Sequence, residues 1–314
     1  MTAEVQSGTG RDQSWLRRSA AAALWLSLAA GALSVARWIL PPSHDYTAHL
    51  VPKAAPLVAA VCGLAVAVLV LTAQVRPERA RTVRVGTGAA IVLGVWGASG
   101  LPLDGLRVIG LIPLSIDWLG FVTRLAALGA AVALAATGTL YGRVAQEACL
   151  RCGRTGPSQS TRPSPKWCGY AAFLAALPYP LIKAYWAAGG TAGTGDGKLI
   201  KGFADGWGTV ILAALGVLLA LALVQEWGRR LPHRLLLLAG AGGALLLVTV
   251  GLPGSYAALQ LIADHGVHAV DGDTKAWVFA VVYGCWLVMA VGMAAAVWAF
   301  WQRHRKACPA CSLV

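Results

Sequence analysis

The sequence predicts an all-α integral membrane protein of eight transmembrane helices, arranged as two parallel four-helix repeats with both termini in the cytoplasm. Three observations lead to this fold class. Hydrophobic residues make up 57% of the 314 residues and charged residues only 12%, about half of the charged share of a soluble domain. The apolar residues are grouped into segments long enough to cross a bilayer. The basic residues gather in short loops between these segments.

The eight apolar segments contain between 19 and 28 residues, and about 20 are enough to cross a hydrocarbon core of about 30 Å. They are apolar around their whole circumference, as is typical of helices surrounded by lipid or by other helices. The first segment follows Arg17 and Arg18 like a signal peptide. It is too long for a cleavable one, so we expect it to remain as a helix. The segments run over residues 19–40, 54–75, 85–103, 118–141, 167–188, 206–225, 235–262 and 276–301.

The loops set the predicted orientation, because cytoplasmic loops of membrane proteins carry an excess of Lys and Arg. Most of the 26 basic residues fall on the side of the two termini. The domain prediction is a cytoplasmic tail at 1–18, a membrane half at 19–142, a cytoplasmic loop at 143–166, a second membrane half at 167–302 and a cytoplasmic tail at 303–314. The excess of Arg over Lys, with abundant Ala and Gly, is typical of a high-GC bacterium, so the predicted location is the bacterial plasma membrane. A net charge of +13 would suit nucleic acid, but basic residues confined to short loops argue against such a partner.

Similar motifs recur in the same order in the two halves, which predicts a parallel four-plus-four duplication. A tryptophan ends the first segment of each half, Gly-Leu-Pro lies near the outer end of the third, and a tryptophan stands 31 residues before a cysteine motif. The alternative is that membrane helix ends generally favour Gly, Pro and Trp. The matching positions are Trp38 and Trp186, Gly100-Leu101-Pro102 and Gly251-Leu252-Pro253, and Trp118 and Trp277.

Two C-x-x-C motifs carry the most specific chemical signal. Cys149 and Cys152 follow the fourth segment, Cys308 and Cys311 follow the eighth, and the predicted topology places all four in the cytoplasm. Four thiolates from two such turns can hold one tetrahedral zinc ion. We therefore expect a structural zinc that clips the C-terminal tail to the central loop. A redox-active thiol pair is one alternative, and cysteines without a role are another.

Histidines form a weaker candidate metal site. His44 and His49 lie in the first outer loop, and His265 and His268 lie in the last. Imidazoles and the neighbouring carboxylates would bind a divalent ion if the two loops meet. The alternative is that these residues are ordinary members of polar loops.

The candidate substrate path consists of four residues within the apolar segments. No segment holds a carboxylate near its centre, where ion-coupled pumps place one. Arg124 and Lys183 lie within two turns of an outer boundary, where long side chains can reach the interface. Lys183 follows Pro178 and Pro180, which interrupt the helical hydrogen bonds as in the broken helices of transporters. A simple kink beside an interfacial lysine is the alternative.

These patterns favour a protein of the lipid bilayer that is not an enzyme and that binds or moves a small, apolar or neutral solute. No nucleotide-binding loop and no nucleophile elbow occurs in the sequence. Two other classes remain open. One is a thiol oxidoreductase or redox sensor, and the other is a scaffold that recruits a cytoplasmic protein partner through the cysteine-bearing tail.

Overall fold

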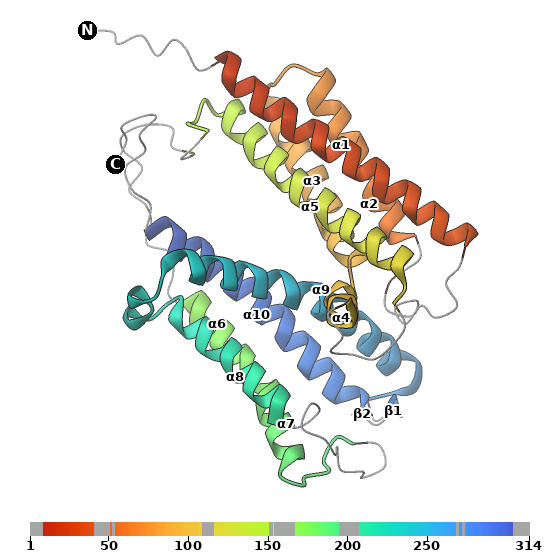
Figure 1. The fold of residues 1–314 in the computed structure, drawn as a ribbon, viewed down its shortest axis with the longest axis vertical. Helices are drawn as coiled ribbons and strands as arrows, with labels where there is room; N and C mark the ends of the chain where they lie inside the picture. Colours follow the sequence, from red (N-terminus) through yellow and green to blue (C-terminus); the bar gives the residue numbers. More distant parts are fainter. Residues whose placement is uncertain are drawn as a thin grey trace. The chain divides into compact units, whose positions relative to one another are not determined.

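The computed structural model describes residues 9–40, 51, 54–108, 116–150, 153, 167–194, 207–267, 270–271 and 274–303, and these ranges are mostly helical (Figure 1). The chain divides into two compact units. Unit 1 consists of Met1–Ser160 with Lys306–Val314, and unit 2 consists of Thr161–Arg305. Each unit contains a bundle of antiparallel helices.

Unit 1 is a four-helix bundle with one additional short helix. Its long helices pack in a closed ring, in which α1 lies against α2 and α5 while α3 lies against the same two helices. The short helix α4 packs against α5. The elements are α1 (Thr9–Ile39), α2 (Ala55–Thr72), the 3-10 turn η1 (Pro77–Arg79), α3 (Ala80–Gly97), α4 (Leu101–Val108) and α5 (Trp118–Ala145).

Small residues allow the helices of unit 1 to approach closely, as in lipid-embedded bundles. The buried core contains mostly Ala and Val, with Leu16, Leu134 and Tyr141 as its large members. The contact between α1 and α2 requires glycine at position 63. A Cβ atom at Gly63 of α2 would lie 2.5 Å from the hydroxyl of Ser27 in α1. The bundle core is therefore tightly packed where Gly63 of α2 meets Ser27 of α1.

Unit 2 also forms a ring of helices. Helix α10 packs against α9 and α6, and α8 packs against α6, α7 and α9. A short antiparallel pair, β1 and β2, leads into α10. The elements are α6 (Trp167–Ala176), α7 (Pro178–Ala187), α8 (Trp207–Ala222), η2 (Glu226–Arg230), α9 (His233–His265), β1 (Val270–Asp271), β2 (Thr274–Lys275) and α10 (Ala276–Arg303).

Within the described residues, five helices are long and apolar enough to cross a membrane. They carry large apolar side chains on their outer surfaces, among them Trp25 at 68%, Leu238 at 74% and Val291 at 68% exposure. Such surfaces suit lipid, because water would disfavour them. The prediction of a helical membrane protein is therefore confirmed at this level. The five are Gln13–Ile39, Ala55–Thr72, Trp118–Ala145, His233–His265 and Ala276–Gln302.

The other three predicted segments do not correspond to any of these five helices. The segment at 85–103 is divided between α3 and α4, because Gly100 adopts a left-handed φ of +87° and ends the regular helix. The segment at 167–188 is divided at Leu177, because the following Pro178 has no N–H to donate. The segment at 206–225 forms α8, which has 16 residues.

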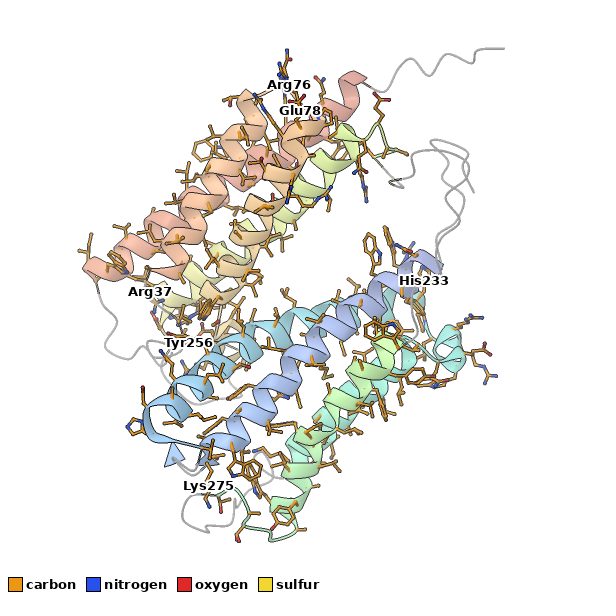
Figure 2. The ribbon with its side chains drawn as sticks, turned by 180° about the vertical axis from the view of Figure 1, so that it is seen from behind. Arg37, Arg76, Glu78, His233, Tyr256 and Lys275 are labelled. Carbon is orange, nitrogen blue, oxygen red and sulfur yellow. The ribbon has the colours of Figure 1, made fainter. Side chains whose placement is uncertain are left out.

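Charged and polar residues mark the two ends of each unit. Figure 2 shows Arg76 and Glu78 at one end of unit 1 and Arg37 at the other, while His233 and Lys275 lie at opposite ends of unit 2. At the Arg76 end, the buried hydroxyl of Tyr141 accepts a hydrogen bond from the Arg76 backbone N–H at 3.2 Å. The opposite end of unit 1 holds a larger polar cluster.

Candidate functional site

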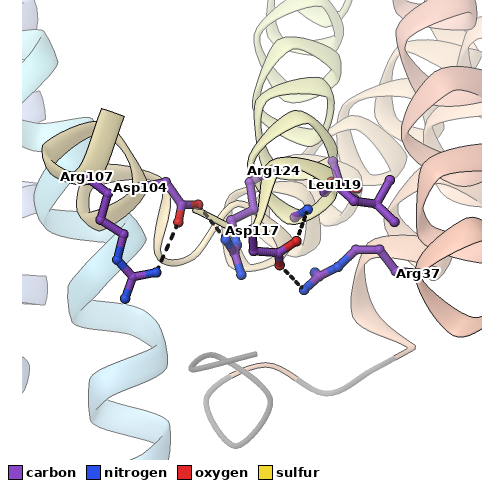
Figure 3. Close-up of polar contacts among 8 residues, drawn as sticks. Arg37, Asp104, Arg107, Asp117, Leu119 and Arg124 are labelled. Carbon is purple, nitrogen blue, oxygen red and sulfur yellow. Dashed lines mark hydrogen bonds and ion pairs between the residues drawn. The ribbon is translucent and has the colours of Figure 1, made fainter. Parts of the chain in front are cut away.

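Five charged side chains gather where α1, α4 and α5 meet in unit 1 (Figure 3). Three are arginines and two are aspartates, and their side chains are between 0% and 15% exposed. Buried charges of this kind are uncommon in proteins unless they are paired. The cluster consists of Arg37 in the last turn of α1, Asp104 and Arg107 in α4, Asp117 at the start of α5 and Arg124 in α5.

Asp117 joins the end of α1 to the start of α5. Its Oδ1 accepts a hydrogen bond from the backbone N–H of Gly120 at 2.8 Å, which caps the N-terminus of α5. Its Oδ2 accepts a hydrogen bond from Nη2 of Arg37 at 3.1 Å. The carboxylate thus satisfies an otherwise unpaired helix N–H group and balances the charge of Arg37 at the same time.

Asp104 and Arg124 form the most deeply buried ion pair of the cluster. Nη1 of Arg124 donates to Oδ2 of Asp104, and the two side chains are 1% and 0% exposed. Arg107, one turn further along α4, lies 3.8 Å from the other carboxylate oxygen of Asp104. Arg124 is six residues into α5, but its guanidinium reaches back to Gly120 in the first turn of that helix. The pair is therefore buried near the N-terminal end of α5.

Glycine at position 120 leaves room for the side chains of Asp117 and Arg124 to lie close together. A Cβ atom there would lie 3.2 Å from Nη1 of Arg124 and would collide with the carboxylate of Asp117. Arg124 and Asp117 therefore occupy the same small region of α5. The charges follow one another in the order Arg37, Asp117, Arg124, Asp104 and Arg107, and positive and negative groups alternate along this order.

The guanidinium of Arg124, which the sequence places within two turns of an outer boundary, is buried against Asp104. The acidic partners were not apparent in the sequence. The segment predicted at 85–103 ends one residue before Asp104, which leaves that carboxylate in an outer loop. The signal available in the sequence is an arginine inside an apolar helix, which requires an acidic partner from elsewhere in the fold.

Lys183 lies in unit 2 among aromatic rings. Pro178 and Pro180 are the first and third residues of α7, and the half-buried Lys183 follows within the same helix. Its Nζ is 5.9 Å from the ring centroid of Tyr179 and 5.5 Å from that of Trp186. Both distances are within the range of cation–π attraction. The Trp286 ring of α10 lies 5.0 Å from Tyr179 and extends this aromatic surface.

The first cysteine motif begins a tight turn after α5. The N–H of Gly153 donates to the carbonyl oxygen of Cys149 at 2.6 Å, and Gly153 has a φ of +71°. The guanidinium of Arg143 donates to the carbonyl oxygen of Leu150. Cys152, Cys308 and Cys311 lie outside the described residues.

The predicted histidine site lies mostly outside the described residues as well. His44, His49 and His268 are not described, and His265 is the exposed last residue of α9. Within the described ranges, no group of three or more His, Cys, Asp or Glu residues lies close enough to hold a metal ion.

Comparison with known proteins adds no further assignment to this site. No protein-family model, curated protein or solved structure matched the chain.

Proposed function

We propose that this chain is a multi-pass protein of the bacterial plasma membrane that binds and moves a small polar solute at the charged end of unit 1. The observation that carries the proposal is the buried Asp104–Arg124 pair. Ionisable groups within membrane helices are costly and rare, and they mark binding sites or translocation paths. The cluster contains both signs of charge, so a polar solute fits it better than the apolar or neutral one expected from the sequence.

The proposed topology has eight spans with both termini in the cytoplasm. Five spans correspond to the long apolar helices. The remaining three would be α3 continued by α4, α6 continued by α7, and α8. In this topology the charged cluster lies at the outer face, and Arg76 and Glu78 lie at the cytoplasmic face. The positive-inside pattern of the loops supports this orientation.

The proposed duplication receives support from the order of helix packing. In both units the first, second, third and fourth helices contact one another in a ring, with the fourth returning to the first. Aligning Trp38 with Trp186, Gly100 with Gly251 and Trp118 with Trp277 pairs each charged residue of the cluster with an uncharged one. The uncharged counterparts of Arg37, Asp104, Arg107, Asp117 and Arg124 are Tyr185, Ser255, Ala258, Ala276 and Tyr283. The charged site would therefore belong to one half only.

A panel of small solutes tests the proposed site. Purified protein is heated in detergent with carboxylates, amines, zwitterions and uncharged polyols, and any solute that raises the melting temperature is then used in a flux assay with proteoliposomes. We expect at least one solute to raise the melting temperature of the wild-type protein by several degrees, because ligands stabilise the state that binds them. Arg124→Gln and Asp104→Asn should abolish this shift.

The matched control is Arg84→Gln, which removes an exposed arginine of α3 in the same unit. It should leave the solute-dependent shift and the flux unchanged. If no solute in the panel shifts the wild-type protein or crosses the vesicle membrane, the proposed function is wrong. If the shift is equal in wild type and Arg124→Gln, solute binding occurs elsewhere.

We also propose the zinc clasp formed by Cys149, Cys152, Cys308 and Cys311. The turn from Cys149 to Gly153 supports it, because its closing hydrogen bond and left-handed glycine suit a tight metal-binding turn. Metal analysis of purified protein should find one zinc per chain in the wild type and none in Cys308→Ser/Cys311→Ser. If neither protein contains zinc, the clasp is wrong.

A further inference from the structure

The motif Gly-Leu-Pro occurs twice in the chain, and the two copies have different backbone conformations. In unit 2, Gly251-Leu252-Pro253 lies within the uninterrupted helix α9. In unit 1, Gly100 has a φ of +87° and separates α3 from α4. Since a left-handed residue cannot continue a right-handed helix, α4 is a separate body joined to α3 through a single turn.

The helical residues that follow the motif also make different contacts with the next helix in the two units. In unit 1, Asp104 on α4 pairs with Arg124 on α5. In unit 2, the ring of Tyr283 on α10 packs directly against Gly254 on α9. Tyr283 is the counterpart of Arg124 in the proposed duplication. One unit therefore joins its third and fourth helices through ions and the other joins them through an aromatic contact.

The aromatic contact in unit 2 indicates that this fold does not need an ion pair at this position. Buried ion pairs generally add little net stability compared with apolar contacts of similar size, and their best-attested role is in specifying or switching a structure. A hinge at Gly100 together with a replaceable polar contact at Asp104 is the arrangement expected of a segment that opens.

We propose that α4 is a gate at the charged end of unit 1, with Gly100 as its hinge and the Asp104–Arg124 pair as its latch. Opening separates the two side chains and exposes Arg124 within α5. The role of the gate in admitting a solute rests on the proposed function, but the movement itself does not. It is therefore tested on the full-length protein without any solute.

Hydrogen exchange followed by mass spectrometry measures the opening. In the wild-type protein, we expect the backbone amides of 103–108 to exchange at least tenfold faster than those of the aligned residues 254–259 in α9. Asp104→Asn should accelerate exchange in α4 by a further tenfold or more while leaving 126–141 of α5 unchanged.

The variant Asp104→Leu/Arg124→Leu distinguishes gate opening from simple fraying at the end of α4. It replaces the ion pair of the latch by an apolar contact. The gate predicts slower exchange in α4 of this variant than in the wild type, whereas fraying gives the same rate in both. Equal rates, or a wild-type α4 that exchanges as slowly as α9, would overturn the proposal. If α4 opens as expected but no solute binds, the gate stands and the proposed function fails.

Discussion

Asp104 of α4 and Arg124 of α5 form an ion pair whose side chains are 0% and 1% exposed. They are 20 residues apart in sequence and belong to different helices of one bundle. Removing water from two such charges costs free energy, and their mutual attraction offsets that cost only while both are present. We therefore expect single and double substitutions of the pair to change the free energy of unfolding by different amounts.

Substitution of Asp104 alone should destabilise the protein more than substitution of both partners. Asp104→Leu removes the acidic partner of both Arg124 and Arg107, so it should lower the unfolding free energy by about 3–5 kcal/mol. Arg124→Leu should cost less, because Arg107 still lies 3.8 Å from the carboxylate of Asp104. The double variant should be more stable than Asp104→Leu, since it no longer contains the buried charge of Arg124. Unfolding by SDS titration in mixed micelles measures all four proteins. Additive losses in the double variant would contradict a direct interaction between the two side chains.

The carboxylate of Asp117 should contribute in two separable ways. Asp117→Asn retains an oxygen that can cap α5 but loses the charge beside Arg37, whereas Asp117→Ala loses both. We expect the alanine variant to be less stable than the asparagine variant by about 1 kcal/mol, the usual contribution of an N-cap. Equal stabilities in SDS titration would assign the whole effect to the charge.

The long apolar helices could be predicted from the sequence because hydropathy is a local property. The five helices that the structure confirms need no information beyond their own residues. The break before Pro178 was also predictable, because the missing N–H of proline is a property of that residue alone. The left-handed conformation of Gly100 was not, since Gly251 has the same two following residues and remains helical.

The charged cluster could be predicted only in part. Arg124 is identifiable as an arginine inside an apolar segment, but its partner depends on a contact between two helices. Asp104 follows the Gly-Leu-Pro motif and lies beyond the apolar segment, so hydropathy assigns it to a loop. The pairing of Arg37 with Asp117 joins residues 80 positions apart. Such pairings are set by the packing of the bundle and not by local sequence.

Lys183 should stabilise unit 2 modestly through the rings of Tyr179 and Trp186. Its Nζ lies 5.9 Å and 5.5 Å from their centroids, and each such contact contributes about 0.5–1 kcal/mol. Lys183→Met should therefore lower the unfolding free energy by about 1 kcal/mol. Lys183→Arg, which keeps the positive charge, should lower it less. Equal losses in the two variants would assign the effect to side-chain shape and not to charge.

Close packing at Gly63 gives a prediction with a matched control. In Gly63→Ala the new methyl group would lie 2.5 Å from the hydroxyl of Ser27 and 3.0 Å from Leu134. Both side chains are buried, so we expect a loss of about 1–3 kcal/mol from overpacking. Gly88→Ala is the control, because a Cβ atom there meets nothing within 4 Å on the exposed face of α3. It should be neutral or stabilising by up to about 1 kcal/mol.

A substitution at Ser27 tests whether its hydroxyl causes the expected loss of stability in Gly63→Ala. Its buried hydroxyl has no hydrogen-bond partner among the described residues, so Ser27→Ala should cost little or even stabilise the bundle. The same change should recover most of the stability lost in Gly63→Ala, because it removes the oxygen that the new methyl group meets. SDS titration of the two single variants and the double variant tests this. If Ser27→Ala gives no recovery, the loss at Gly63 comes from Leu134 or from a shift of α2 against α1.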